Sequence, residues 1–223
     1  MVAPRVVDLM GKRVTITGAM RADVVAELPE IEWIADPGLR ETVTDAWAAA
    51  LAASGFSRIS EMKPSGNYDT RPLRHGTQAD HFRSVTRLAV KIAEEMAALF
   101  PSFHYDRDIL IAGCLCHDIG KVWEFDPANV KRWNADPRAN GRPSIRHPGY
   151  GLYICLTLGL PEAVAHCAAA HSGEGELVVR SLENTILHQA DYTFWRVVEA
   201  GGQLADSDPW LDGELSGRSG TKI

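Results

Sequence analysis

From Asp80 onward, apolar residues recur every three or four positions, which is the spacing of one face of an α-helix. The stretch DHFRSVTRLAVKIAEEMAALF carries such a stripe, and Pro101 ends it because proline cannot continue a helix. A second helix is expected over DRDILIAGCLCHDIG, ending near Gly120, and its almost continuous apolar sequence indicates a central, buried element. Further helices are expected over PGYGLYICLTLGL, PEAVAHCAAAH and SLENTILHQADYTFWRVVEA. The pattern predicts an all-α fold for this part of the chain.

Other segments lack this pattern. Residues 1–70 combine a short β-like run, RVTITG, with a helix over GLRETVTDAWAAALAASGF and the start of a loop over KPSGNYDTRPLRHG. Residues 126–146 contain three prolines and several turn formers, so a long loop is expected there. We therefore expect a mixed N-terminal extension over residues 1–70, a helical domain over 71–203 and a flexible tail over 204–223.

Composition narrows the functional classes only slightly. A chain of 223 residues with a formal net charge of −6 has no general affinity for a nucleic acid polymer or an anionic membrane, although a local basic patch can still bind an anion. Apolar runs stay well short of the roughly 18 residues that a membrane-spanning helix needs, and the N-terminus MVAPRVVDLMGKR lacks a signal-peptide pattern. The four cysteines lie in apolar stretches, where reduced thiols are expected. These features indicate a soluble, cytoplasmic protein.

One apolar run, ILIAGCLCHDIGKVWEF, is interrupted by two adjacent polar residues, His117 and Asp118. Buried without a partner, each would cost roughly 1–3 kcal/mol or more, so the fold must supply one. A metal ion is a suitable partner, because neutral imidazoles and carboxylates bind Zn, Mn, Fe or Ni. Each ligand-type residue alone is more often an ordinary core or surface residue, and only the combination indicates a metal site. The other members of that combination are His81, His147, His171 and Asp191.

The order of these residues resembles the motif of a known family. The series H81…H117-D118…H147…H171…D191, with CLCHDIGK around its centre, is similar to the motif of the HD-domain superfamily of metal-dependent phosphohydrolases. The stretch DHFRSVTRLA resembles the first helix of that family, and the similarity covers roughly residues 72–202. The resemblance implies an all-α helical cluster that gathers its ligands at the middle.

The resemblance also implies how the ligands are shared. His81, His117, Asp118 and Asp191 are expected to hold one metal ion. The further pair, His147 and His171, is similar to the dinuclear branch, in which the aspartate of the HD pair bridges two divalent transition metals. A carboxylate suits this role because each of its two oxygens can face a different cation. Two such cations can bridge a hydroxide, lower its pKa and stabilise charge on a transferred phosphoryl group.

Other residues are candidates for substrate contact. Lys121, in the HDIGK stretch, is expected either to meet a phosphate as a catalytic or binding group or to pair with an acidic side chain. Arg142 and Arg146 belong to a basic loop next to His147, which favours a small anionic substrate. Glu174, on a glycine-flanked turn, is a general acid, a group that holds a water, or an ordinary exposed glutamate.

Four histidines lie outside the six-residue series. His75 is an alternative first ligand, although His81 leads the amphipathic helix as in the family. No motif role is expected for His104, His166 or His188; the last of these lies three residues before Asp191 and so on a neighbouring helix face.

The leading functional hypothesis is hydrolysis of a phosphate ester or anhydride in a small metabolite or nucleotide. A mixed-valent di-iron oxygenase of the same fold uses the same ligand set, and hydrolysis of a non-phosphate bond at the same centre is a further alternative. A degenerate binding module would have lost ligands, whereas all six are present. Cleavage of cyclic dinucleotides is disfavoured, because HSGEGELVVRSLEN lacks the Gly-Tyr-Pro element of that branch.

Overall fold

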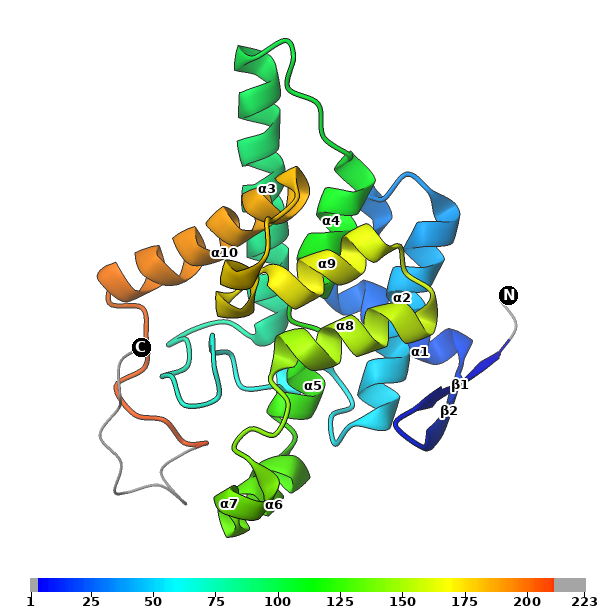
Figure 1. Ribbon diagram of the computed structural model, residues 1–223, viewed down its shortest axis with the longest axis vertical. Coiled ribbons are helices and arrows are strands. Elements are labelled where there is room, and N and C mark those ends of the chain that lie inside the picture. Colours follow the sequence, from blue (N-terminus) through cyan, green and yellow to red (C-terminus); the bar gives the residue numbers. More distant parts are fainter. Residues whose placement is uncertain (1–3, 211–223) are drawn as a thin grey trace.

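A computed structural model describes residues 4–210 of the chain, and Figure 1 shows a cluster of helices with one small hairpin at its edge. The hairpin pairs β1 and β2 in antiparallel fashion, with Arg5 opposite Ile16 and Leu9 opposite Lys12. The fold class predicted from the sequence is therefore confirmed. The elements are β1 (Arg5–Leu9), β2 (Lys12–Ile16), α1 (Gly18–Glu27), η1 (Pro29–Trp33), α2 (Pro37–Ala53), η2 (Ile59–Glu61), α3 (Gln78–Leu99), α4 (Arg107–Cys116), α5 (Lys121–Glu124), α6 (Pro127–Ala135), α7 (Pro137–Asn140), α8 (His147–Leu158), α9 (Glu162–Ala170), η3 (Gly173–Leu177) and α10 (Leu182–Ala200).

Local hydrogen bonds set the ends of the two helices that carry the first ligands. At the start of α3, the Thr77 hydroxyl accepts from the backbone N–H of Asp80 while the Asp80 carboxylate accepts from the Thr77 N–H, which is a capping box. Helix α4 ends at Cys116 rather than near Gly120, because the bond from Ile119 N to the Cys116 carbonyl tightens the chain into a turn. His117 and Asp118 lie on this turn.

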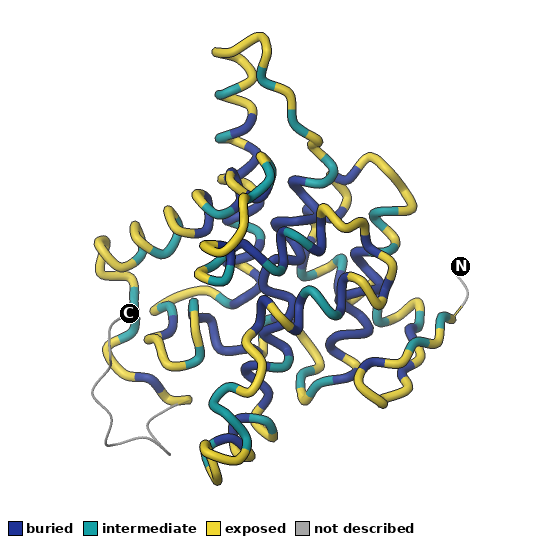
Figure 2. The backbone as a smooth tube through the Cα atoms, viewed as in Figure 1, coloured by how far each residue is buried: buried dark blue, intermediate teal, exposed yellow. Residues whose placement is uncertain are grey.

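The N-terminal segment packs into the same core as the later helices. Helix α2 contacts α4 and α8, and the indole N–H of Trp47 donates to the Leu115 carbonyl at 2.9 Å. Figure 2 shows the buried positions gathered where these helices meet. The cluster joins residues such as Ile16 and Trp47 to Ile119 and Ile154. The segment expected as an extension thus contributes directly to the support of the HD turn, and its boundary at residue 70 stays a prediction.

The expectation of a loop over residues 126–146 is wrong in part. Helices α6 and α7 occupy Pro127–Ala135 and Pro137–Asn140. Each follows an aspartate whose side chain accepts from the first turn: Asp126 from Ala128 N at 2.8 Å, and Asp136 from Ala139 N at 3.0 Å. An aspartate followed by proline is a helix-start signal, so these prolines begin helices rather than interrupt them.

The segment after α10 is tied to the body as far as the structure describes it. Leu204 forms a β-bridge with Leu73, and Ala205 N donates to the Pro72 carbonyl at 2.9 Å. Farther along, the carboxylate of Asp208 pairs with the buried ammonium of Lys63. The flexible tail expected over residues 204–223 is therefore held by contacts through Asp208, while residues 211–223 lie outside the described part of the chain.

Candidate metal centre

Helices distant in the sequence bring the six predicted ligand residues to one point. His81 lies in the first turn of α3, and His117 and Asp118 lie on the turn after α4. The remaining three come from later helices: His147 begins α8, His171 follows the last residue of α9, and Asp191 lies within α10. All six side chains are buried.

Two sets of donor atoms face the two oxygens of Asp118. Oδ2 lies 3.4 Å from His81 Nε2 and 3.3 Å from His117 Nε2. On the other side, Oδ1 lies 3.2 Å from His147 Nε2 and 3.3 Å from His171 Nε2. The Asp118 carboxylate therefore stands between two pairs of imidazoles, one pair on each oxygen.

The carboxylate of Asp191 completes the first set. Its Oδ1 lies 3.4 Å from His81 Nε2 and 3.9 Å from His117 Nε2, and this buried oxygen has no hydrogen-bond partner within residues 4–210. Two donors that are each about 2.1 Å from one ion are about 3.0–3.4 Å apart at octahedral or tetrahedral angles. The distances of 3.4 Å between Asp191 Oδ1 and His81 Nε2 and of 3.3 Å between the Nε2 atoms of His81 and His117 fit a shared cation, whereas Asp191 Oδ1 and His117 Nε2, at 3.9 Å, are wider apart than this range. The donor types suit a divalent transition metal.

Comparison with known families agrees with this geometry. A family model of the HD domain matches residues 79–195, more than half of the chain. The chain belongs to the HD-domain family. The matched range contains all six ligand-type residues, and the family consists largely of metal-dependent hydrolases. No curated protein and no solved structure matches the chain. Within residues 4–210, no helix is long and apolar enough to cross a membrane.

Backbone carbonyls orient two of the imidazoles of this HD domain. Nδ1 of His117 lies 2.7 Å from the Cys114 carbonyl, and Nδ1 of His171 lies 3.0 Å from the Ala168 carbonyl. Because a carbonyl only accepts, each Nδ1 carries the proton and donates. Each Nε2 then keeps its lone pair for the centre, which is the tautomer that a metal ligand needs.

A third imidazole, that of His147, is oriented by the carboxylate of Glu124, which the sequence analysis does not identify as a site residue. Nδ1 of His147 lies 2.5 Å from Glu124 Oε2, and the same oxygen accepts from the His147 backbone N–H at 2.6 Å. Burial acts to raise the pKa of Glu124, but the contacts with His147 outweigh it and lower the pKa. Glu124 lies in the apolar stretch VWEF, and a carboxylate inside such a stretch is the sequence feature that could have identified it as a functional residue.

Gly120 allows α8 to approach the HD turn. A Cβ atom at this position would lie 2.0 Å from the His147 carbonyl oxygen and 2.6 Å from the Gly151 nitrogen. Since both are backbone atoms, a side chain here would displace the first turn of α8 together with His147. Glycine at 120 is therefore required for the placement of this imidazole.

Lys121 lies inside the HD domain rather than at its surface. Its ammonium lies 2.5 Å from Asp118 Oδ2 and donates to the Ser65 carbonyl at 2.7 Å, and the side chain is fully buried. Burial acts to raise the pKa of Asp118, but Lys121, His117 and His147 outweigh it and hold that pKa well below its usual range. Of the two roles expected for Lys121, the contacts favour pairing with an acidic side chain.

The histidines near Asp118 differ in their proton affinity. Burial lowers the pKa of His81 to about 4 and also lowers that of His171. For His117, burial likewise acts to lower the pKa, but the carboxylates of Asp118 and Asp191 outweigh it and raise the pKa above its ordinary value. His81 and His171 are therefore neutral near pH 7 and available as ligands.

Arg146 and Glu174 meet at the rim of the centre. Arg146 Nε lies 3.2 Å from Glu174 Oε1, and its Nη2 donates to the side-chain oxygen of Asn67 at 2.9 Å. Arg146 directly precedes His147, and Glu174 follows His171 along the chain. This ion pair therefore joins the two segments that carry the histidines on Oδ1 of Asp118.

The other basic candidate and the remaining histidines make contacts with groups other than the six donor side chains. Arg142 pairs with Asp69 at 3.1 Å. His75 and His104 are exposed, His166 Nε2 accepts from the Ser181 backbone N–H, and His188 Nδ1 donates to the carbonyl of His171. Thus His81, and not His75, takes the position expected for the first histidine of the motif.

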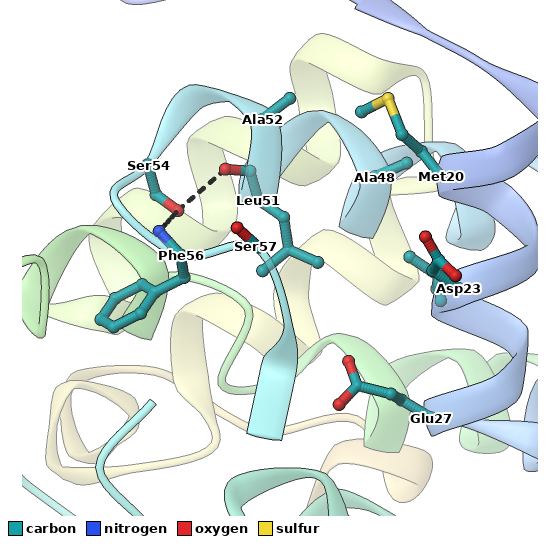
Figure 3. A pocket seen from close by; sticks show the side chains of 10 residues that line it. Met20, Asp23, Glu27, Ala48, Leu51, Ala52, Ser54, Phe56 and Ser57 are labelled. Atoms are coloured by element: carbon teal, nitrogen blue, oxygen red, sulfur yellow. Dashed lines mark hydrogen bonds between the residues drawn. The ribbon is translucent and has the colours of Figure 1, made fainter. Parts of the chain in front are cut away.

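A pocket of about 340 Å³ lies elsewhere, between α1, α2 and residues 54–57 (Figure 3). Figure 3 shows Asp23 and Glu27 on α1 across from Leu51 and Phe56. The oxygens of Glu27 accept from the backbone N–H groups of Ile59 and Ser60, at 2.8 and 3.1 Å. The described residues that line this pocket include none of the predicted site residues.

Proposed function

We propose that this HD-domain protein is a dinuclear metal-dependent hydrolase that cleaves a phosphate ester or anhydride of a small metabolite or nucleotide. The observation that carries the proposal is the position of Asp118, whose two oxygens each face a separate pair of imidazoles at 3.2–3.4 Å. A mononuclear site would need only one such set. The second pair of histidines has no other evident purpose in the described core.

The residues divide naturally between two ions. His81, His117, Asp191 and Oδ2 of Asp118 would hold the first, and His147, His171 and Oδ1 of Asp118 would hold the second. When bound, two cations would supply an activated water near neutral pH and positive charge for the phosphoryl oxygens. Fe, Mn, Zn and Ni all suit this set of nitrogen and oxygen donors.

The chain's own groups prepare the site for that chemistry. The carbonyls of Cys114 and Ala168 and the carboxylate of Glu124 hold the imidazole protons on Nδ1, so that each Nε2 faces the centre. Lys121 keeps Asp118 ionised and orients it through Oδ2, which still has a second lone pair for a cation. We assign Lys121 this positioning role in preference to a direct contact with substrate.

Arg146 is our candidate for binding the anionic part of the substrate. It is half-exposed, precedes a ligand-type histidine and, within residues 4–210, forms its ion pair with the carboxylate of Glu174. An arginine binds a phosphate through two parallel hydrogen bonds, which orients the group as well as attracting it. In this arrangement Glu174 holds the guanidinium at the rim, and Arg142 lies farther along the same basic segment.

The decisive experiment measures metal content and oxidation state together with activity. Protein purified without added metal should contain two transition-metal ions per chain, and it should hydrolyse at least one member of a panel of phosphomonoesters, nucleotides and phosphonates without oxygen. Asp118→Ala should fail in both assays. A mixed-valent di-iron signal with turnover that requires oxygen would overturn the hydrolase and support the oxygenase.

A second experiment tests the substrate side. Arg146→Ala should lower kcat/KM on the best substrate by about ten- to a hundredfold while metal content stays unchanged, because one charge-assisted contact is lost. Arg142→Ala should have a smaller effect. Arg138→Ala, a change of an exposed arginine on α7, is the matched control. Wild-type kcat/KM in the Arg146 variant, or an uncharged best substrate, would exclude the anion-binding role.

A further inference from the structure

A second concave surface lies between η1, the middle of α3 and the start of α4. This groove has a volume of about 520 Å³ and is lined by Trp33, Arg87, Val90, Lys91, Glu94 and Arg107. The volume is within the range of about 300–1,000 Å³ that small-molecule sites occupy. Along α3, residue 91 is ten residues beyond residue 81, or about 15 Å at 1.5 Å per residue, so the groove is separate from the candidate metal centre.

The lining carries an excess of positive charge. Three of the six lining residues are basic and one is acidic, whereas the whole chain has a net charge of −6. Arg83, Arg87 and Lys91 follow one another at four-residue intervals and therefore share one face of α3. Arg107, the first residue of α4, contributes its charge from the opposite wall.

Two of these cations have no anionic partner in the described residues. The buried carboxylate of Glu30 pairs with two arginines. Arg83 Nε lies 3.2 Å from its Oε2, and Arg87 Nε donates to its Oε1 at 2.7 Å. Arg107, by contrast, donates from Nη1 to a neutral group, the backbone carbonyl of Trp33, at 3.0 Å. Lys91 makes no hydrogen bond or ion pair within residues 4–210, and Glu94 on the next turn is not within ion-pair distance of it.

An aromatic ring stands beside the unpaired cations. Trp33 is 40% exposed although it lines the groove, and Val90, which also lines it, is 5% exposed. An exposed indole next to two cations offers a stacking surface for a flat ring together with charge for an anion. A plain anion would not need the indole, and an apolar ligand would leave both cations unpaired.

We propose that this groove binds a small anion that carries a flat aromatic ring, as a nucleotide does. Its phosphate or carboxylate groups contact Lys91 and Arg107, and its ring stacks on Trp33. Arg87 also lines the groove, but its side chain is hydrogen-bonded to Glu30. It therefore contributes to the positive potential and does not contact the ligand. The binding does not require the metal ions, and the proposal stands independently of the hydrolytic activity.

The test uses α,β-methylene ADP as the probe, because its P–C–P bridge is not hydrolysed; absence of adenosine release during the titration checks that the remaining 5′ ester also stays intact. Calorimetric titration of the metal-loaded full-length protein should give a saturable site at the groove that persists in Asp118→Ala, separate from any binding at the metal centre, with weaker binding of adenosine and of pyrophosphate. Lys91→Ala and Arg107→Ala should each raise Kd about tenfold or more, since each removes a charge-assisted contact. Trp33→Leu should weaken the probe but leave the Kd of pyrophosphate unchanged. Lys131→Ala, an exposed lysine on α6, is the control.

Other results would overturn the proposal. A Kd that is unchanged in the Lys91 and Arg107 variants but lost in Asp118→Ala would mean that the probe binds only at the metal centre. Absence of binding at about 1 mM probe would exclude the site. Tighter binding of an acidic peptide than of the probe would mean that the groove serves a protein partner instead.

Discussion

Glu124 offers the sharpest test of how the centre is built, because a single oxygen of its side chain serves two groups of His147. Oε2 accepts from the backbone N–H at 2.6 Å and from Nδ1 at 2.5 Å. Glu124→Gln keeps an oxygen for both contacts but removes the charge. Glu124→Leu removes the oxygen itself while preserving a side chain of comparable volume. The two variants therefore separate the charge of the carboxylate from the hydrogen bonds that it accepts.

The structure sets the size of each effect. Loss of a carboxylate that orients a ligand histidine typically costs about ten- to a hundredfold in metal affinity or activity. We expect the lower end for Glu124→Gln and the upper end for Glu124→Leu. The leucine variant also leaves the buried His147 N–H without an acceptor, at about 1–3 kcal/mol. For a chain of this size that corresponds to a fall in Tm of about 2–12 °C, whereas the glutamine variant should stay close to wild type.

The assay is metal content at graded free metal concentration, measured with turnover and thermal unfolding. Both variants should keep the ion assigned to His81, His117 and Asp191 and lose affinity for the other one. Glu162→Leu, a change of an exposed glutamate at the start of α9, is the control for replacing a carboxylate. If Glu124→Leu bound two ions with wild-type affinity, Glu124 would not orient His147 and the reasoning would fail.

Further predictions concern other parts of the centre and its support. Asp118→Ala should lower metal content from two ions to none, and two ions retained in that variant would exclude a bridging carboxylate. His147→Ala should leave about one ion and reduce turnover sharply; full metal content with wild-type turnover would indicate a mononuclear site. Gly120→Ala should lower Tm and weaken the second ion, whereas Gly18→Ala, where an added Cβ meets nothing within 4 Å, should unfold like wild type. Trp47→Ala should cost about 3–5 kcal/mol of unfolding free energy, measured by denaturant titration, and an unchanged midpoint would mean that α2 does not support α4.

The helices of this chain were predictable because their signals are local. The apolar stripe after Asp80 and the prolines at 148 and 161 mark the helices that the structure contains. Asp126–Pro127 and Asp136–Pro137 carry the same kind of signal and begin α6 and α7, although prolines in a polar segment are also typical of a loop. The loop predicted over residues 126–146 was therefore wrong although the local signal for two helices is present in the sequence.

The sequence alone determined the helical class and the types of ligand. Both depend on the spacing and identity of single residues, so the HDIGK motif and its histidines can be identified from the sequence. The packing of the helices sets which oxygen of Asp118 faces which imidazole, buries Lys121 against that carboxylate and places Glu124 beside His147. These contacts join helices that are far apart in the chain. Because the groups are buried, each contact shifts the pKa of its partners or fixes the tautomer of a histidine.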